Sequence, residues 1–236
     1  MAIKHSTIGA NVSPASLGPD QSKAERVYSE LRRRIRELAL PPGAPLRKEE
    51  IALELGVSRA PVSEAIARLA DEALVDVFPQ HGSFVAPIRA KDVRESLFIR
   101  TALEVEAIRR VTKIADAPFL ARLEANLADQ SAALKAGDLA LFYDLDEDLH
   151  AAIFSAIETP RALRLLDAAR APLDRPRRLA LPEEGRANAT FAEHRRLVDS
   201  IRSGDPEYAG AAMRVHLAMV ASAVERELAE IEAKNA

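Results

Sequence analysis

Three of the five histidines fall at positions where they could bind one metal ion together. His150, His194 and His216 lie in three separate stretches of helical periodicity, each on a face shared with apolar residues. Asp146 precedes His150 by four residues, so one helix would place the two side chains about 6 Å apart at their Cβ atoms. The spacing predicts that Asp146, His150, His194 and His216 hold one divalent metal ion per chain. Imidazole and carboxylate ligands suit Zn, Ni, Mn or Fe.

Each histidine could instead be a core residue whose ring nitrogens are satisfied by hydrogen bonds, and the spacing alone leaves this alternative open. The carboxylate favours the metal. On the expected helix, Asp146 shares its face with Phe142, Leu149 and Ile153. Burying a carboxylate without a partner costs several kcal/mol or forces it to take up a proton. A metal ion accounts for both the carboxylate and the histidines.

A second group of residues has the chemistry to contact DNA. Ser58 and Arg59 follow a Gly56-Val57 turn, where a new helix is expected to begin. The free N–H groups at a helix N-terminus can meet a phosphate, and an arginine there can contact a guanine or a phosphate. Four arginines on the preceding expected helix (Arg32, Arg33, Arg34 and Arg36) are either a phosphate-binding patch or a solvated face.

The elements expected around these residues give a mainly α fold in two domains. Residues 1–20 show no hydrophobic periodicity and are interpreted as a disordered tail. Residues 21–88 read helix, helix, turn, helix and β-hairpin, which is the order of a winged helix-turn-helix DNA-binding domain. Residues 89–236 are expected to form an all-α bundle that holds the candidate metal site and binds a ligand. Its helices are expected at about 91–115, 118–136, 138–158, 160–174, 187–203 and 206–233.

The N-terminal half resembles the GntR family of regulators. The resemblance rests on the Pro-Gly turn at Gly43, the Leu55-Gly-Val-Ser-Arg59 turn and the glycine of the expected wing, Gly82. It implies that the third helix enters the major groove and that the wing tip reaches the minor groove. Ser63 stands where the family usually has arginine and Lys48 where many members have glutamate, so the preferred DNA sequence is expected to differ. The predicted DNA-contacting residues are Lys48, Ser58, Arg59, Ser63, His81 and Gly82.

The C-terminal half resembles the FCD domain, the effector domain of the FadR branch of that family. The matching motifs are Asp146-x-x-x-His150, Glu193-His194, Met213-x-x-His216 and Arg100-x-x-Leu103-Glu104. The resemblance implies that all four metal-ligand positions are filled and that a small organic acid binds the metal through its carboxylate. Arg100 is expected to point inward and contact this effector, or alternatively to form an intrahelical pair with Glu104. Arg177 and Arg178 are expected in an exposed, Pro-rich connection, although they could cover the pocket.

These patterns predict a ligand-responsive transcriptional regulator, a repressor that binds a double-stranded DNA operator as a homodimer. Three alternatives are kept. A metal-dependent enzyme could use the Asp and three histidines, but no His-Glu-x-x-His helix is present and Glu193 is expected to point off the metal face. An acyl-CoA-responsive regulator of the FadR type is disfavoured, because that branch lacks the metal residues. The metal could also be purely structural, with no effector.

Composition excludes some sites and gives weak evidence on partners. The chain has no cysteine, which rules out disulfides and thiolate metal sites. Its net charge of −3 does not by itself indicate a nucleic-acid-binding protein. No apolar run has the length of a membrane span and no signal-peptide core is seen, so a cytoplasmic protein without a membrane partner is expected.

Overall fold

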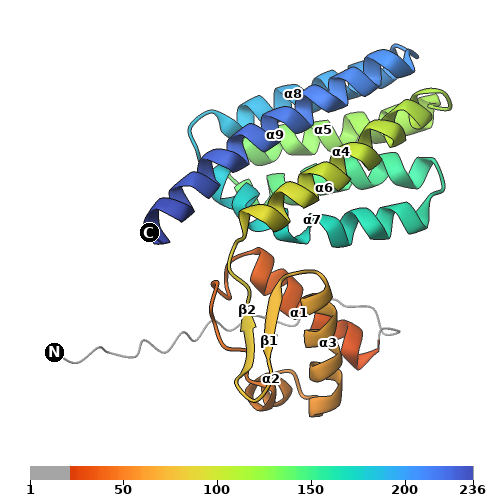
Figure 1. The fold of residues 1–236 in the computed structure, drawn as a ribbon. Helices are drawn as coiled ribbons and strands as arrows, with labels where there is room; N and C mark the ends of the chain where they lie inside the picture. The colour runs from red at the N-terminus through yellow and green to blue at the C-terminus, as the bar shows by residue number, and fades with distance from the viewer. Residues whose placement is uncertain (1–21, 236) are drawn as a thin grey trace.

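The computed structural model describes residues 22–235, so the predicted disordered tail at 1–20 lies outside the described residues. Helices dominate this part of the chain, with one small antiparallel sheet, which confirms the mainly α fold (Figure 1). The elements in chain order are α1 (Lys23–Arg36), α2 (Lys48–Glu54), α3 (Arg59–Asp71), β1 (Val75–Phe78), β2 (Gly82–Val85), α4 (Ala90–Thr112), α5 (Ala117–Ala136), α6 (Leu139–Ala156), α7 (Pro160–Ala180), α8 (Arg186–Arg202) and α9 (Pro206–Asn235).

The N-terminal unit is built on the packing of α1 against α3. The side chain of Ser22 caps α1 by accepting a hydrogen bond from the backbone N–H of Glu25 at 3.1 Å. Val27, Leu31 and Ile35 recur at helical spacing and are buried in the core that α1 shares with α3. This core fixes the direction of α3, the helix expected to read DNA.

The wing is a two-stranded hairpin that follows α3. β1 and β2 pair antiparallel, with Val75 opposite Val85 and Phe78 opposite Gly82. Gly82 has φ of +108°, a conformation that residues with a side chain rarely adopt, so glycine is required where the chain turns. The turn lies at the end of the unit farthest from the helical bundle, beside α2 (Figure 1).

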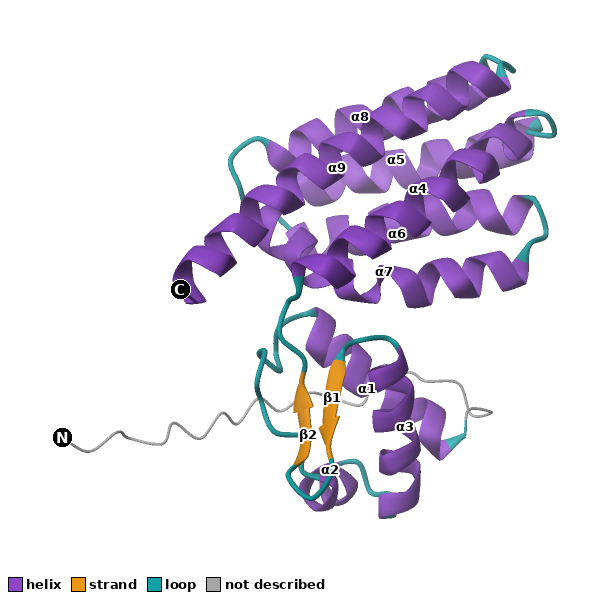
Figure 2. Cartoon of the chain, in the orientation of Figure 1, coloured by secondary structure: helices purple, strands orange, loops and turns teal. Residues whose placement is uncertain are grey.

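Helices α4 to α9 form the bundle above this unit (Figure 2). The long helix α4 packs against α9 and α7, and α5 packs against α6 and α8. Three of these helices, α6, α8 and α9, carry the predicted metal ligands. The core around them includes Ile108, Leu149, Leu197, Met213 and Leu217. Burying each such side chain contributes roughly 1.5–3 kcal/mol, which holds the ligand-bearing helices in place.

Helix α7 is longer than the sequence analysis predicted. The expected end was residue 174, because prolines at 172 and 176 each remove a backbone donor and disfavour a helix interior. The helix instead continues through Pro172 and Pro176 to Ala180. Every residue from Arg170 to Arg177 is buried, so tertiary packing outweighs the local cost of the prolines. The prediction of an exposed, irregular connection around residue 177 was therefore wrong.

None of the helices between residues 22 and 235 combines the length and the apolar composition needed to cross a bilayer.

Candidate functional site

Three histidines from three helices meet in the core of the bundle. His150 comes from α6, His194 from α8 and His216 from α9, and each is almost fully buried. One ring nitrogen from each lies within 4.8 Å of the others, and the ring centroids are 5.0–5.7 Å apart. The structure thus brings together the three histidines that the sequence placed in one site.

Asp146, the fourth predicted ligand, lies beside this cluster. It is one turn before His150 on α6 and is buried. Its Oδ1 atom is 3.2 Å from Nε2 of His194, and its Oδ2 atom is 2.6 Å from Nη2 of Arg177. One oxygen therefore faces the histidines while a guanidinium holds the other.

Each histidine is oriented through its Nδ1 atom by a side chain behind it. Nδ1 of His194 lies 2.8 Å from Oε1 of Gln130, and Nδ1 of His216 lies 2.8 Å from Oε2 of Glu193. Nδ1 of His150 forms a close ion pair with Glu104. An acceptor at Nδ1 favours the tautomer that leaves the Nε2 lone pair free, the arrangement usual for metal-binding histidines.

The inner atoms of the cluster lack partners of their own. Among the described residues, Nε2 of His216 is buried without a hydrogen bond, and Oδ1 of Asp146 and Nε2 of His194 are close but not aligned to bond. Buried polar atoms are rarely left in this state, since each costs about 1–3 kcal/mol. Two imidazole nitrogens and a carboxylate oxygen directed at one place fit a divalent cation.

The protonation states also suit metal binding. Burial lowers the pKa of His216 well below its usual range, and the neighbouring His194 and His150 add to the effect. Burial likewise lowers the pKa of His150, although Glu104 opposes it. Burial alone would raise the pKa of Asp146, but Arg177 outweighs it and holds the pKa well below its usual range. Neutral imidazoles beside an ionised carboxylate are the forms that bind metal.

Arg100 reaches the cluster from α4 and is fully buried. Its guanidinium forms a close pair with Glu104, and its Nη2 atom lies 3.1 Å from Nε2 of His150, while Nη1 has no partner. The sequence left open whether Arg100 points inward or pairs with Glu104 on its own helix, and the structure shows both. The guanidinium stands beside the ligands with one donor free.

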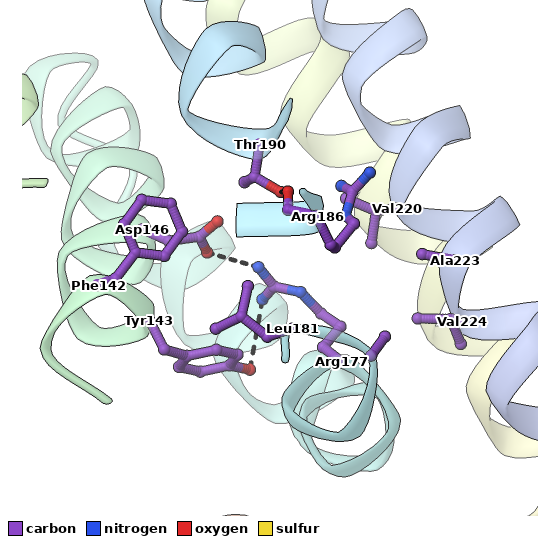
Figure 3. Close-up of a pocket in the computed structure, with 11 residues that line it drawn as sticks. Phe142, Tyr143, Asp146, Arg177, Leu181, Arg186, Thr190, Val220, Ala223 and Val224 are labelled. Carbon is purple, nitrogen blue, oxygen red and sulfur yellow. Dashed lines mark hydrogen bonds and ion pairs between the residues drawn. The ribbon is translucent and has the colours of Figure 1, made fainter. Parts of the chain in front are cut away.

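A small cavity of about 20 Å³, room for roughly one water molecule, opens next to Asp146 (Figure 3). Its polar lining comes from Tyr143, Asp146, Arg177, Arg186 and Thr190, and Arg100 is not part of it. Arg177 is 8% exposed, which overturns the expectation that it is solvent-exposed. The apolar wall comprises Phe142, Leu181, Val220, Ala223 and Val224.

The predicted DNA-contacting residues gather at the end of the N-terminal unit away from the bundle. Ser58 is the N-cap of α3 but makes no side-chain capping bond, and Arg59 is its exposed first residue. Nη1 of Arg59 lies 2.5 Å from Oε1 of Glu49 on α2. Lys48 is the first residue of α2, and Ser63 is the fifth residue of α3. His81 lies in the hairpin turn, and Gly82 is the first residue of β2.

The arginines of α1 do not form one patch. Arg33 and Arg34 pair with carboxylates at the surface of the unit. Arg32 and Arg36 reach across to α7 and α6 instead: Arg32 pairs with Asp167, and Arg36 pairs with Asp174 and Glu147. For Arg32 and Arg36, the two alternatives considered from the sequence, a phosphate-binding patch and a solvated face, were both wrong. The sequence pattern of one helix could not reveal these contacts, because the partners of Arg32 and Arg36 lie on other helices.

Other residues of the site were also missed. Gln130 was passed over, although it lies on the buried stripe of α5 with Leu123 and Ala133, where a polar residue is unusual. Glu193 was considered only as a motif residue that points off the metal face. Its contact with Nδ1 of His216 requires α8 and α9 to be side by side, which periodicity alone does not give.

Comparison with known proteins agrees with this division of the chain. The FCD domain family matches residues 95–219, and the gntR family of bacterial regulatory proteins matches residues 23–85. An uncharacterised HTH-type transcriptional regulator from an unstable DNA locus of Streptomyces ambofaciens is 36% identical over 200 residues, covering 85% of this chain and 84% of that protein.

Two further proteins are similar over most of their length. The HTH-type transcriptional repressor RspR of Escherichia coli K12 is 29% identical over 208 residues, covering 88% of this chain and 91% of that protein. The solved structure of E. coli McbR/YncC has a TM-score of 0.77 at 21% identity and covers 88% of this chain and 99% of that chain. At that identity the likeness concerns the fold.

Proposed function

The chain belongs to the gntR family of bacterial regulatory proteins and carries an FCD domain, and from this premise we propose that it is a metal-dependent, acid-responsive repressor. Members of this family are transcriptional regulators rather than enzymes; they bind DNA operators, and FCD domains bind small-molecule effectors. We place the DNA-binding domain at 21–88 and the effector domain at 89–236. We expect the protein to act in the cytoplasm as a homodimer.

The observation that carries the metal proposal is the set of inward-facing atoms without partners. Nε2 of His194 and His216 and Oδ1 of Asp146 are buried at one place, and an acceptor behind each histidine fixes its ring. His150 completes the set once Arg100 releases its Nε2 atom. The ion, one per chain and of the Zn, Ni, Mn or Fe class, would supply positive charge and open coordination positions for an oxygen ligand.

The effector is proposed to be a small carboxylate that lies between the cluster and a guanidinium. Arg100 has an unpartnered Nη1 atom and can offer a two-donor fork to a carboxylate. The cavity beside Asp146 does not reach Arg100 and is too small for an organic acid, so binding requires the side chains around the cluster to move apart. Effector binding would therefore change the conformation of the bundle, and such a change is needed if the effector is to alter the affinity of the N-terminal unit for DNA.

DNA binding is assigned to the exposed end of the N-terminal unit. Arg59 and the N-terminus of α3 are free to enter a major groove, and the turn at Gly82 is free to reach the adjacent minor groove. A two-fold homodimer would read a near-palindromic operator. The name of the E. coli relative supports repression rather than activation.

One experiment tests the metal and the effector together. Protein purified without chelator is analysed for bound metal, and its affinity for DNA selected from a random pool is measured with and without a panel of organic acids. We expect about one metal ion per chain and an acid that weakens DNA binding about 5- to 150-fold. A metal without any acid response would favour a structural ion, and a response only to acyl-CoA would favour the FadR type. A protein that contains no metal and shows no response to any acid would overturn the proposal.

A further inference from the structure

Helix α7 belongs to both units of the molecule. Its Ala171 is buried in the core of the N-terminal unit with Leu31 and Ile35 of α1. Six residues later, Arg177 holds the Oδ2 atom of Asp146 beside the histidine cluster. In Figure 1 it is the helix of the bundle that lies nearest to the N-terminal unit. A displacement at the cluster therefore has a direct route to α1.

Five side chains form a continuous path along that route, here called the interdomain relay: Asp146, Arg177, Tyr143, Asp174 and Arg36. Nη2 of Arg177 is 2.6 Å from Asp146, and its Nη1 donates to the Tyr143 hydroxyl at 3.4 Å (Figure 3). That hydroxyl donates to Oδ1 of Asp174 at 2.8 Å. Oδ2 of Asp174 lies 2.5 Å from Nε of Arg36, the last residue of α1.

The relay is buried, so its charges depend on one another. Asp146, Tyr143 and Asp174 are at most 2% exposed, and water can screen little of their interaction. Carboxylates and guanidiniums alternate along the path, with the tyrosine hydroxyl between them. Burial raises the pKa of Tyr143 above its usual range, with the charge of Asp174 adding to the effect, so the hydroxyl keeps its proton and can donate. A change in the charge at one end must be compensated by rearrangement along the path.

Arg36 has a second partner to which it can turn. It pairs with Glu147 as well as with Asp174, and Glu147 is also held by Arg170 at 2.7 Å. Because α1 packs against α3, a change in the partner of Arg36 changes how the DNA-reading helix sits relative to the bundle. Because Arg36 contacts both carboxylates at once, it can move toward Glu147 without losing every partner when its contact with Asp174 weakens.

We propose that the interdomain relay transmits the occupancy of the metal cluster to α1. This inference rests on the proposed metal site and describes how metal binding there would affect α1. When Asp146 shares its charge with a cation at Oδ1, it holds Arg177 less tightly. The guanidinium then shifts toward Tyr143 and Asp174, competes with Arg36, and loosens the contact between α7 and α1. The cluster is thus connected to the end of α1 from one predicted ligand, Asp146, through residues that are not ligands themselves.

The test uses the full-length protein and Zn²⁺ as the probe. Hydrogen–deuterium exchange of α1 is measured with and without Zn²⁺, and Zn²⁺ affinity is measured by calorimetry. In the unmodified protein, Zn²⁺ should change exchange in α1 about 5-fold or more. Tyr143→Phe removes only the hydroxyl of the relay, so it should bind Zn²⁺ within about threefold of normal and lose the response of α1. Tyr208→Phe alters a half-exposed tyrosine on α9 and should behave like the unmodified protein.

A second variant keeps the proposal testable if Tyr143→Phe unfolds. Asp174→Asn keeps an acceptor for the tyrosine hydroxyl but loses the charge that holds Arg36, and it should abolish the same response. A normal α1 response in both variants, or an α1 that never responds while Zn²⁺ binds, would overturn the relay. If the unmodified protein fails to bind Zn²⁺ in calorimetry and also fails to bind Ni²⁺ or Mn²⁺, the metal function itself is wrong. The two failures are therefore distinguishable.

Discussion

The Oε2 atom of Glu193 lies 2.8 Å from Nδ1 of His216, so a carboxylate of α8 orients a histidine of α9. Its sequence neighbour His194 enters the same cluster from α8. Burial raises the pKa of Glu193, although Arg186 opposes the shift. The pair fixes which nitrogen of His216 faces the other histidines. One helix therefore supplies both a histidine of the cluster and the carboxylate that orients another histidine.

Replacing Glu193 should weaken metal binding without removing a ligand. Groups that hydrogen-bond to the outer nitrogen of a metal-binding histidine typically contribute about 10- to 100-fold to metal affinity, so we expect Glu193→Ala to lose this much Zn²⁺ affinity in calorimetry. Glu193→Gln keeps an oxygen that can accept from Nδ1 and should lose less. Glu183→Ala, which removes an exposed glutamate paired with Arg226, is the control. Equal Zn²⁺ affinity in Glu193→Ala and the control would remove Glu193 from the site.

Removing the metal should lower the thermal stability of the protein. A ligand that binds only the folded state stabilises it by about 2.7 kcal/mol at a free concentration 100 times its Kd. Adding EDTA should therefore lower the Tm, and restoring Zn²⁺ should raise it again. His216→Ala should lose most of this Zn²⁺-dependent shift, whereas His81→Ala, in the wing, should keep it. A Tm that responds to Zn²⁺ equally in both variants would place the ion elsewhere.

The fold and the clustering of the three histidines were predictable because both depend on local periodicity. Apolar residues at helical spacing locate α6, and Asp146 and His150 then fall on one face of it. The relay was not predictable. Arg177 reaches Asp146 only because α7 continues through Pro172 and Pro176, which depends on packing from other helices. Arg36 looked like any arginine of a basic helix, since its partners are far along the chain.

Arg59 should account for a measurable part of operator binding. Its side chain is exposed at the start of α3, and within residues 22–235 its one ion-pair partner is Glu49, so it can turn to DNA at small cost. Arg59→Ala is expected to lose about 1–3 kcal/mol of binding to a selected DNA site in a fluorescence-anisotropy titration. Arg94→Ala removes an exposed arginine on α4 that pairs with Glu225 and should leave the affinity unchanged. If both variants bind alike, Arg59 does not contact the operator.

Arg100 should be required for the response to an acid. Its guanidinium is fully buried between Glu104 and His150, and Nη1 has no partner. Arg100→Ala should keep the metal and the operator affinity but lose the acid response. Truncating Arg100 alone, however, leaves the buried negative charge of Glu104 without its positive partner, and breaking a buried ion pair in this way can lower stability by about 3–5 kcal/mol. The double variant Arg100→Gln with Glu104→Gln removes both charges together. It should stay folded and bind DNA, but an effector acid should no longer weaken that binding.

The control for that variant and the opposite outcome both follow from the structure. Arg94→Gln with Glu225→Gln neutralises an exposed arginine–glutamate pair between α4 and α9, and its acid response should match that of the unmodified protein. Arg100 does not line the cavity beside Asp146, whereas Arg186 does. Arg186→Gln is therefore measured in parallel, with DNA affinity and Tm recorded at each acid concentration. If the Arg100 variant responds normally and Arg186→Gln does not, the acid lies in the cavity and the assignment of Arg100 is wrong.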